Sequence, residues 1–80
     1  MRTEIRMASL GYDMEAGRIG AWLKQVGERV ERGEAIVEVE TDKATLDMEA
    51  TQSGTLAEIV AQAGQEVPVG DVVAYLDADA

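Results

Sequence analysis

The chain has 80 residues, of which 16 are acidic and 7 basic, and its formal net charge at pH 7 is −9. That length allows one small domain, and because the chain has one tryptophan and no phenylalanine, its core is expected to be aliphatic. It contains neither cysteine nor histidine, which excludes disulfides, thiolate metal sites and nucleophiles activated by histidine. The acidic balance also argues against nucleic acid or an anionic membrane as a partner.

The first predicted elements are a strand over residues 4–10 and a loop over residues 11–17. Ile5 and Met7 alternate with polar residues, as is typical of a strand with one buried face. The loop lies between two glycines, and we expect its two apolar side chains, Tyr12 and Met14, to close the edge of the core.

Residues 18–32 give an ambiguous local signal. Trp22, Val26 and Val30 have the spacing of one face of a helix. Gly27, in the middle of that window, argues against a helix.

An internal repeat resolves this ambiguity, because the chain resembles itself at an offset of 37 residues. The coinciding pairs are Gly17 and Gly54, Gln25 and Gln62, Gly27 and Gly64, Val30 and Val67, and Gly33 and Gly70. Coinciding glycines indicate shared backbone geometry, since glycine permits unusual dihedral angles. Pro68 excludes a helix in the second copy, so the first copy is predicted to be strand and turn as well. Two such halves predict two antiparallel sheets packed about a pseudo-twofold axis.

The apolar alternation slips at the same place in both copies. The corresponding residues are Ile19, Trp22 and Leu23 in the first and Leu56, Ile59 and Val60 in the second. A shared slip predicts a β-bulge or a corner in each copy. The direction in which the Trp22 ring points stays open.

Residues 37–50 form two alternating segments separated by Asp42 and Lys43, a pattern that predicts a tight β-hairpin with one buried face. Asp42 suits the turn because its carboxylate can accept bonds from nearby backbone amides. Lys43 is then expected at the tip, projecting into solvent.

The repeat offset relates Lys43 to Ala80, so the hairpin and the end of the chain are predicted at opposite ends of the domain. The tail over residues 77–80 has the composition of a solvated linker. The domain is therefore expected to occupy residues 1–77, with residues 78–80 beginning a linker.

The residues alone leave two interpretations of Lys43: a charge that keeps the hairpin tip soluble, or an attachment point. The neighbouring carboxylates favour its charged form, and a Schiff-base lysine would need desolvation or a cationic neighbour. The other lysine, Lys24, is expected to be an ordinary solvated residue. Glu38, Glu40 and Asp42 recur about 7 Å apart along a strand, which is wide for a shared metal, so they are interpreted as a solvated or recognition face with no metal.

The motif Glu40-Thr41-Asp42-Lys43-Ala44 resembles the lipoylation motif of lipoyl domains in the acyltransferase components of 2-oxo acid dehydrogenase complexes. The resemblance extends over residues 7–76. It includes Met7-Ala8-Ser9-Leu10, Met14-Glu15-Ala16-Gly17, Trp22-Leu23-Lys24, Gly27-Glu28-Arg29-Val30, Gly33 and Val67-Pro68-Val69-Gly70. It implies an all-β fold, a flattened barrel or sandwich of two four-stranded antiparallel sheets.

The resemblance also implies the site residues. Lys43 would carry lipoate through an amide, and Glu40, Asp42 and Ala44 would be read by the attaching ligase or transferase and by partner enzymes. The loop after the first strand would contribute to partner choice through Tyr12, Asp13, Met14 and Glu15. That loop departs from the family, with Ala8 where proline is common and Gly11-Tyr12-Asp13 where Ser-Pro-Thr is usual, which leaves the particular complex open.

As a member of this family, the domain would be a non-catalytic swinging-arm carrier from a dihydrolipoamide acyltransferase. It would shuttle acyl groups and reducing equivalents between a thiamine-dependent 2-oxo acid decarboxylase, the acyltransferase core and dihydrolipoamide dehydrogenase. A pyruvate complex is the first choice, with branched-chain and acetoin complexes open. The main alternative is a biotinyl carrier domain, whose lysine is usually flanked by methionines. A glycine-cleavage carrier would need additional helices, and a phosphopantetheine carrier would need a serine opening a helix, which Ser9 and Ser53 do not supply.

No apolar stretch approaches transmembrane length, and residues 1–4 do not begin like a signal peptide. With the resemblance, this predicts a soluble monomeric domain in the bacterial cytoplasm, or in the mitochondrial matrix after processing.

Overall fold

The structure is a computed structural model that describes residues 1–9, 14–42 and 44–79. Within these residues the chain forms strands and no helix, and so no helix capable of crossing a membrane. The strands are β1 (Arg2–Arg6), β2 (Ala16–Trp22), β3 (Arg29–Val30), β4 (Ala35–Glu40), β5 (Thr45–Glu49), β6 (Gly54–Ile59), β7 (Glu66–Pro68) and β8 (Val72–Ala78).

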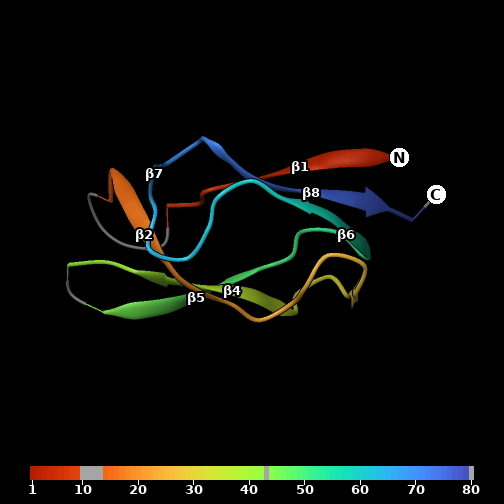
Figure 1. Cartoon of the computed structure of the whole chain (residues 1–80), viewed down its shortest axis with the longest axis horizontal. Helices are drawn as coiled ribbons and strands as arrows, with labels where there is room; N and C mark the ends of the chain where they lie inside the picture. The colour runs from red at the N-terminus through yellow and green to blue at the C-terminus, as the bar shows by residue number, and fades with distance from the viewer. Residues whose placement is uncertain (10–13, 43, 80) are drawn as a thin grey trace.

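The strands form two four-stranded antiparallel sheets, ordered β1-β8-β6-β3 and β5-β4-β2-β7. The sheets pack face to face as a flattened sandwich (Figure 1). This is the predicted all-β architecture, and the absence of helix among the described residues also confirms the choice of strand and turn for residues 18–32.

The predicted pseudo-twofold symmetry is present in the pairing registers. At the offset of 37, the β2–β4 pairs Arg18–Glu40 and Ile19–Val39 become the β6–β8 pairs Thr55–Asp77 and Leu56–Leu76. Both registers then shift at equivalent places, between Ile19 and Ala21 and between Leu56 and Glu58. The shared slip in the apolar alternation is therefore a β-bulge in each sheet.

Gly27 and Gly64, which are related by the repeat, allow the chain of each half to turn from one sheet to the other. Gly27 and Gly64 have φ angles of 96° and 90°, in the left-handed region that side chains disfavour. Their amides donate to the carbonyls of Leu56 and Ile19 at 2.8 and 2.7 Å. Each half thus binds to a strand of the other half through an equivalent glycine.

The core between the sheets is aliphatic, with methionine in place of aromatic residues. No polar or charged residue is buried in the described part of the chain. The core residues are Ile5, Met7, Ile19, Val30, Ile36, Val37, Val39, Met48, Ala50, Leu56, Ala61, Val67, Val73, Ala74 and Leu76.

The first strand is shorter than predicted. It ends at Arg6 rather than Leu10, which lies outside the described residues. Met7 leaves the ladder because its amide and carbonyl bond with the turn before β8, at Asp71 and Gly70 (2.8 and 2.9 Å). The prediction that Ile5 and Met7 are both buried is nonetheless correct, since these side chains are 8% and 1% exposed.

Trp22, whose facing was left open, packs half-buried against the core. Its indole Nε1 donates to the carbonyl oxygen of Ala61 at 2.8 Å. The ring therefore joins the end of β2 to the segment that follows β6.

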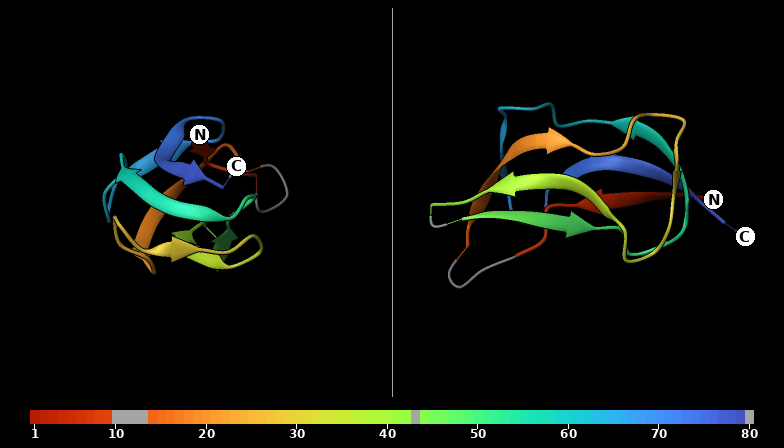
Figure 2. Two further views of the ribbon diagram at one scale, coloured as in Figure 1. Left: turned by 90° about the vertical axis from the view of Figure 1, so that its right-hand side faces the viewer. Right: turned by 90° about the horizontal axis from the view of Figure 1, so that it is seen from below.

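The two termini lie together at one end of the long axis, and β4 ends and β5 begins at the other (Figure 2). Met1 and Ala78 exchange backbone bonds of 2.7 and 3.2 Å, and β8 includes Ala78, the first residue that we expected to belong to a linker. Asp79 is bound as well, through its amide to the carbonyl of Ser53 at 3.0 Å. Ala78 and Asp79, which we expected to begin a linker, are thus each bonded to a neighbouring segment.

Candidate functional site

The hairpin predicted to carry the functional lysine is present as β4 and β5. Their ladder runs from Ala35–Glu49 to Glu40–Thr45. Beyond it, Thr41 closes the turn: its amide and hydroxyl both donate to the Ala44 carbonyl at 2.8 Å, and its hydroxyl accepts from the Ala44 amide at 3.2 Å. We had expected Asp42 to stabilise the turn. The hydroxyl of Thr41 does so instead, and a threonine at the start of a turn is itself a known turn signal.

Among the described residues at the tip, Asp42 and Ala44 are exposed, as are Glu40 and Thr45 at the strand ends. Lys43 lies outside the described residues, so its attachment role stays a prediction. Its described neighbours Asp42 and Ala44 lie just beyond the paired ends of β4 and β5, at the end of the molecule opposite the termini (Figure 2).

The outer face of the β4–β5 hairpin is acidic and is not neutralised. Glu38, Glu40, Asp42, Asp47 and Glu49 form no ion pair with any described residue. Groups of acids and histidines or cysteines close enough to bind a metal are also absent from residues 1–9, 14–42 and 44–79. The hairpin therefore presents an anionic, solvated surface on both sides of the turn.

The loop residues expected to choose partners are only partly described. Tyr12 and Asp13 lie outside the described residues. Met14 is half-buried and packs against the core, and its Cε lies 2.7 Å from where a Cβ on Gly17 would stand. Glu15 is exposed, and its carbonyl accepts from the amide of Val69 at 2.8 Å. Met14 thus closes the core edge, as predicted, while the side chain of Glu15 remains available to a partner.

Lys24 is not the free solvated amine that we expected. Its Nζ lies 2.9 Å from Oε2 of Glu34, and that hydrogen bond raises the pKa of Lys24. The pKa of Glu34 is lowered, first by the bond that its carboxylate accepts from the Glu31 amide at 2.9 Å and then by Lys24. Lys24 is therefore held by a partner on the chain.

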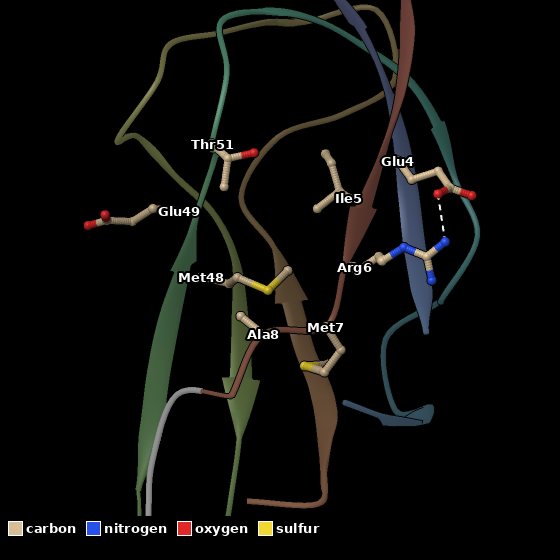
Figure 3. Close-up of a pocket in the computed structure, with 8 residues that line it drawn as sticks. All are labelled: Glu4, Ile5, Arg6, Met7, Ala8, Met48, Glu49 and Thr51. Carbon is tan, nitrogen blue, oxygen red and sulfur yellow. Dashed lines mark hydrogen bonds and ion pairs between the residues drawn. The ribbon is translucent and has the colours of Figure 1, made fainter. Parts of the chain in front are cut away.

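A groove of about 350 Å³ opens between β1 and β5, the edge strands of the two sheets (Figure 3). Ile5, Met7 and Met48 form its apolar wall, and Glu4 on its rim is paired with Arg6 at 2.6 Å.

A duplicated sandwich that presents an exposed hairpin turn, remote from its termini, defines a carrier domain of the biotinyl and lipoyl type. The family model described as "Biotin-requiring enzyme" matches residues 3–76. The chain therefore belongs to the biotin/lipoyl-attachment family, and it is a lipoyl domain of the kind found in acyltransferase components of 2-oxo acid dehydrogenase complexes.

Three similar proteins illustrate this relationship. Dihydrolipoyllysine-residue acetyltransferase component 3 of the mitochondrial pyruvate dehydrogenase complex of Arabidopsis thaliana is 50% identical over 72 residues, which is 89% of this chain and 13% of that protein. The solution structure of the lipoyl domain of the Azotobacter vinelandii 2-oxoglutarate dehydrogenase complex is 34% identical, with a TM-score of 0.72 over 91% of this chain and 92% of that domain. The crystal structure of Kluyveromyces lactis urea carboxylase is 26% identical, with a TM-score of 0.79 over 95% of this chain and 6% of that enzyme. The chain spans only 13–19% of the curated relatives that it matches.

Proposed function

We propose that this domain carries lipoate on Lys43 and acts as a swinging arm within a 2-oxo acid dehydrogenase complex. It would shuttle acyl groups and reducing equivalents between a thiamine-dependent decarboxylase, an acyltransferase core and dihydrolipoamide dehydrogenase. The observation that carries the proposal is the β4–β5 turn, whose described residues Asp42 and Ala44 are exposed at the end opposite the termini.

The residues around the turn fit a group attached from outside. Ala44 is small and exposed, Asp42 is exposed, and Thr41 fixes the turn through three bonds to Ala44. Bonds between the residues that flank the tip reduce the conformational freedom that an attaching enzyme would otherwise have to restrict on binding. Lys24, the other lysine, is paired with Glu34 and lies outside this turn.

When bound, lipoate supplies a reducible disulfide and a thiol that can carry an acyl group. The protein's part is to place that group and to be recognised. Glu40, Asp42 and Glu15 supply exposed carboxylates for recognition by the attaching ligase or transferase and by the partner enzymes. The chain contains no cysteine, so it has no thiolate of its own to exchange with the carried disulfide.

The particular complex is a finer proposal. We assign the domain to a pyruvate complex because it is 50% identical to the Arabidopsis acetyltransferase, against 42% to the succinyltransferase component of the Staphylococcus saprophyticus 2-oxoglutarate dehydrogenase complex. The domain would be a monomer without catalytic activity, part of an acyltransferase chain in the bacterial cytoplasm or the mitochondrial matrix. A biotinyl carrier is the alternative, supported by the fold of urea carboxylase, but the 34% identity to a domain titled as lipoyl favours lipoate.

Intact mass after incubation with lipoate, ATP and a lipoate ligase tests the proposal. We expect one lipoyl-sized increment in the wild type and in Lys24→Arg, and none in folded Lys43→Arg. A biotin-sized increment with biotin and a biotin ligase, or no increment with either, would overturn it. Reductive acylation of the loaded domain by pyruvate, 2-oxoglutarate, branched-chain and acetoin-type decarboxylases would then identify the complex, and we expect the pyruvate enzyme to be the fastest.

A further inference from the structure

The repeat relates two aspartates that lie in different surroundings. Asp79 follows β8 and corresponds, at the offset of 37, to Asp42, which follows β4. Oδ1 and Oδ2 of Asp79 accept bonds from Nη1 and Nη2 of Arg29 at 2.9 and 2.7 Å. Asp42 is exposed, and its side chain bonds with no other described residue. One end of the domain therefore has a bound carboxylate where the other end has an unbound one.

The difference follows from the residues at equivalent positions in β3 and β7. Arg29 of β3 lies opposite Thr55 of β6, and Glu66 of β7 lies opposite Arg18 of β2. Arg29 corresponds to Glu66 and Thr55 to Arg18 at the repeat offset. Glu66 thus occupies, relative to Asp42, the place from which Arg29 binds Asp79. A carboxylate at that place has no N–H to donate, so it cannot bind Asp42 as Arg29 binds Asp79.

The hydrogen-bonded strand pairing is also more extensive at the end with the bound aspartate than at the hairpin end. The β6–β8 ladder includes the pair Gly54–Ala78, whereas the equivalent β2–β4 ladder stops one pair earlier, at Arg18–Glu40. Chain ends are ordinarily the parts of a domain that fray. Here the chain end has the additional ladder pair and the ion pair, and the hairpin end has neither within the described residues.

We propose that Glu66 is a positioning residue for cofactor attachment: it stands where an arginine would bind Asp42, and so keeps that carboxylate available to the attaching enzyme. The inference rests on the proposed attachment at Lys43. It adds a control of that reaction by a residue on a different strand, β7. The bound state at the other end of the domain serves as an internal reference for what an arginine does at this position.

The test is to install the missing arginine. In Glu66→Arg, made together with Arg18→Thr so that the cross-strand neighbour matches the Thr55 opposite Arg29, the new guanidinium should bind Asp42 as Arg29 binds Asp79. All variants at position 66 are compared in this Arg18→Thr background. The pKa of the Asp42 carboxyl, followed by NMR titration, should then be lower than in Glu66→Gln, which removes the charge without adding a donor. The rate of ligase-catalysed lipoylation should fall roughly two- to fivefold in Glu66→Arg relative to Glu66→Gln, the range that an exposed ion pair supports.

Two further variants isolate the cause. When position 42 is asparagine, the Glu66→Arg and Glu66→Gln variants should be lipoylated at the same rate, because the arginine has lost its partner. Arg29→Glu should release Asp79, seen as faster amide exchange there, without affecting lipoylation. All variants should retain the wild-type β-sheet circular dichroism.

Equal Asp42 pKa values in the Arg and Gln variants would overturn the proposal, as would a rate loss that persists with Asn at position 42. If the wild type accepts no lipoate, the proposed function fails, whereas the Asp42 titration still decides whether position 66 controls that carboxylate.

Discussion

Replacing Gly54 with alanine should be among the most damaging single-methyl changes in this domain. A Cβ at Gly54 would overlap the carbonyl oxygen of Asp77 and would lie 2.8 Å from Cα of Ala78 and 2.9 Å from the carbonyl carbon of Asp77. All three atoms belong to the β8 backbone, which cannot rotate aside as a side chain can. Relief requires β6 and β8 to separate at the pair Gly54–Ala78.

We expect Gly54→Ala to lower the free energy of unfolding by about 3 kcal/mol, the upper part of the usual range for overpacking. For a domain of this size, that loss lowers Tm by roughly 12–24 °C. The equivalent change Gly17→Ala provides a matched control. Its Cβ would meet side-chain atoms, Cγ1 of Val39 at 2.5 Å and Cε of Met14 at 2.7 Å, which can partly move aside. We expect a loss of about 1–2 kcal/mol there.

Urea denaturation followed through the fluorescence of Trp22 measures both variants against the wild type. Equal losses at Gly54 and Gly17, or a larger loss at Gly17, would refute the reasoning that backbone contacts distinguish the two sites. So would a Gly54→Ala variant as stable as the wild type.

Three further changes test individual contacts. Trp22→Phe removes the bond to the Ala61 carbonyl and should cost about 1 kcal/mol by urea denaturation followed by circular dichroism; an unchanged stability would show that this bond does not join the two segments. Thr41→Val should cost about 0.5–1 kcal/mol because it removes the hydroxyl that bonds Ala44, whereas Thr41→Ser should retain most of the stability; equal losses would exclude the hydroxyl as the cause. The pKa of Asp79 is lowered from 3.8, first by its hydrogen bond from an arginine, so its stabilising effect is present above that value and is lost as pH falls through the folded-state pKa. Asp79→Asn should therefore flatten the fall in the urea midpoint at acidic pH, and an unchanged slope would contradict the assignment.

Much of this fold was predictable because the chain encodes the same geometry twice. The first copy alone did not separate strand from helix around Trp22, but Pro68 excluded a helix in the second copy and the offset transferred that exclusion to the first. The irregular alternation at equivalent places in both copies predicted a β-bulge or a corner there, and the pairing registers show a bulge in each. The hairpin followed from alternation that is strict on both sides of the turn.

The features that escaped prediction depend on contacts between distant residues. Arg29 and Asp79 are 50 positions apart, and their ion pair orders a tail whose composition suggests a linker. The indole bond of Trp22 spans 39 positions, so the local pattern could not orient its ring. The sequence alone did not indicate a role for Arg29 or Glu66, because charged residues on edge strands are usually solvated. Their opposite charges become apparent only when the two halves are aligned.

Peptide-level mass spectrometry of the domain after ligase treatment tests the central claim most directly, because it distinguishes Lys43 from Lys24 within one sample. We predict a lipoyl increment on the peptide that contains Lys43 and an unmodified Lys24. An increment on Lys24, or an unmodified Lys43 in a folded domain exposed to an active ligase, would contradict the account.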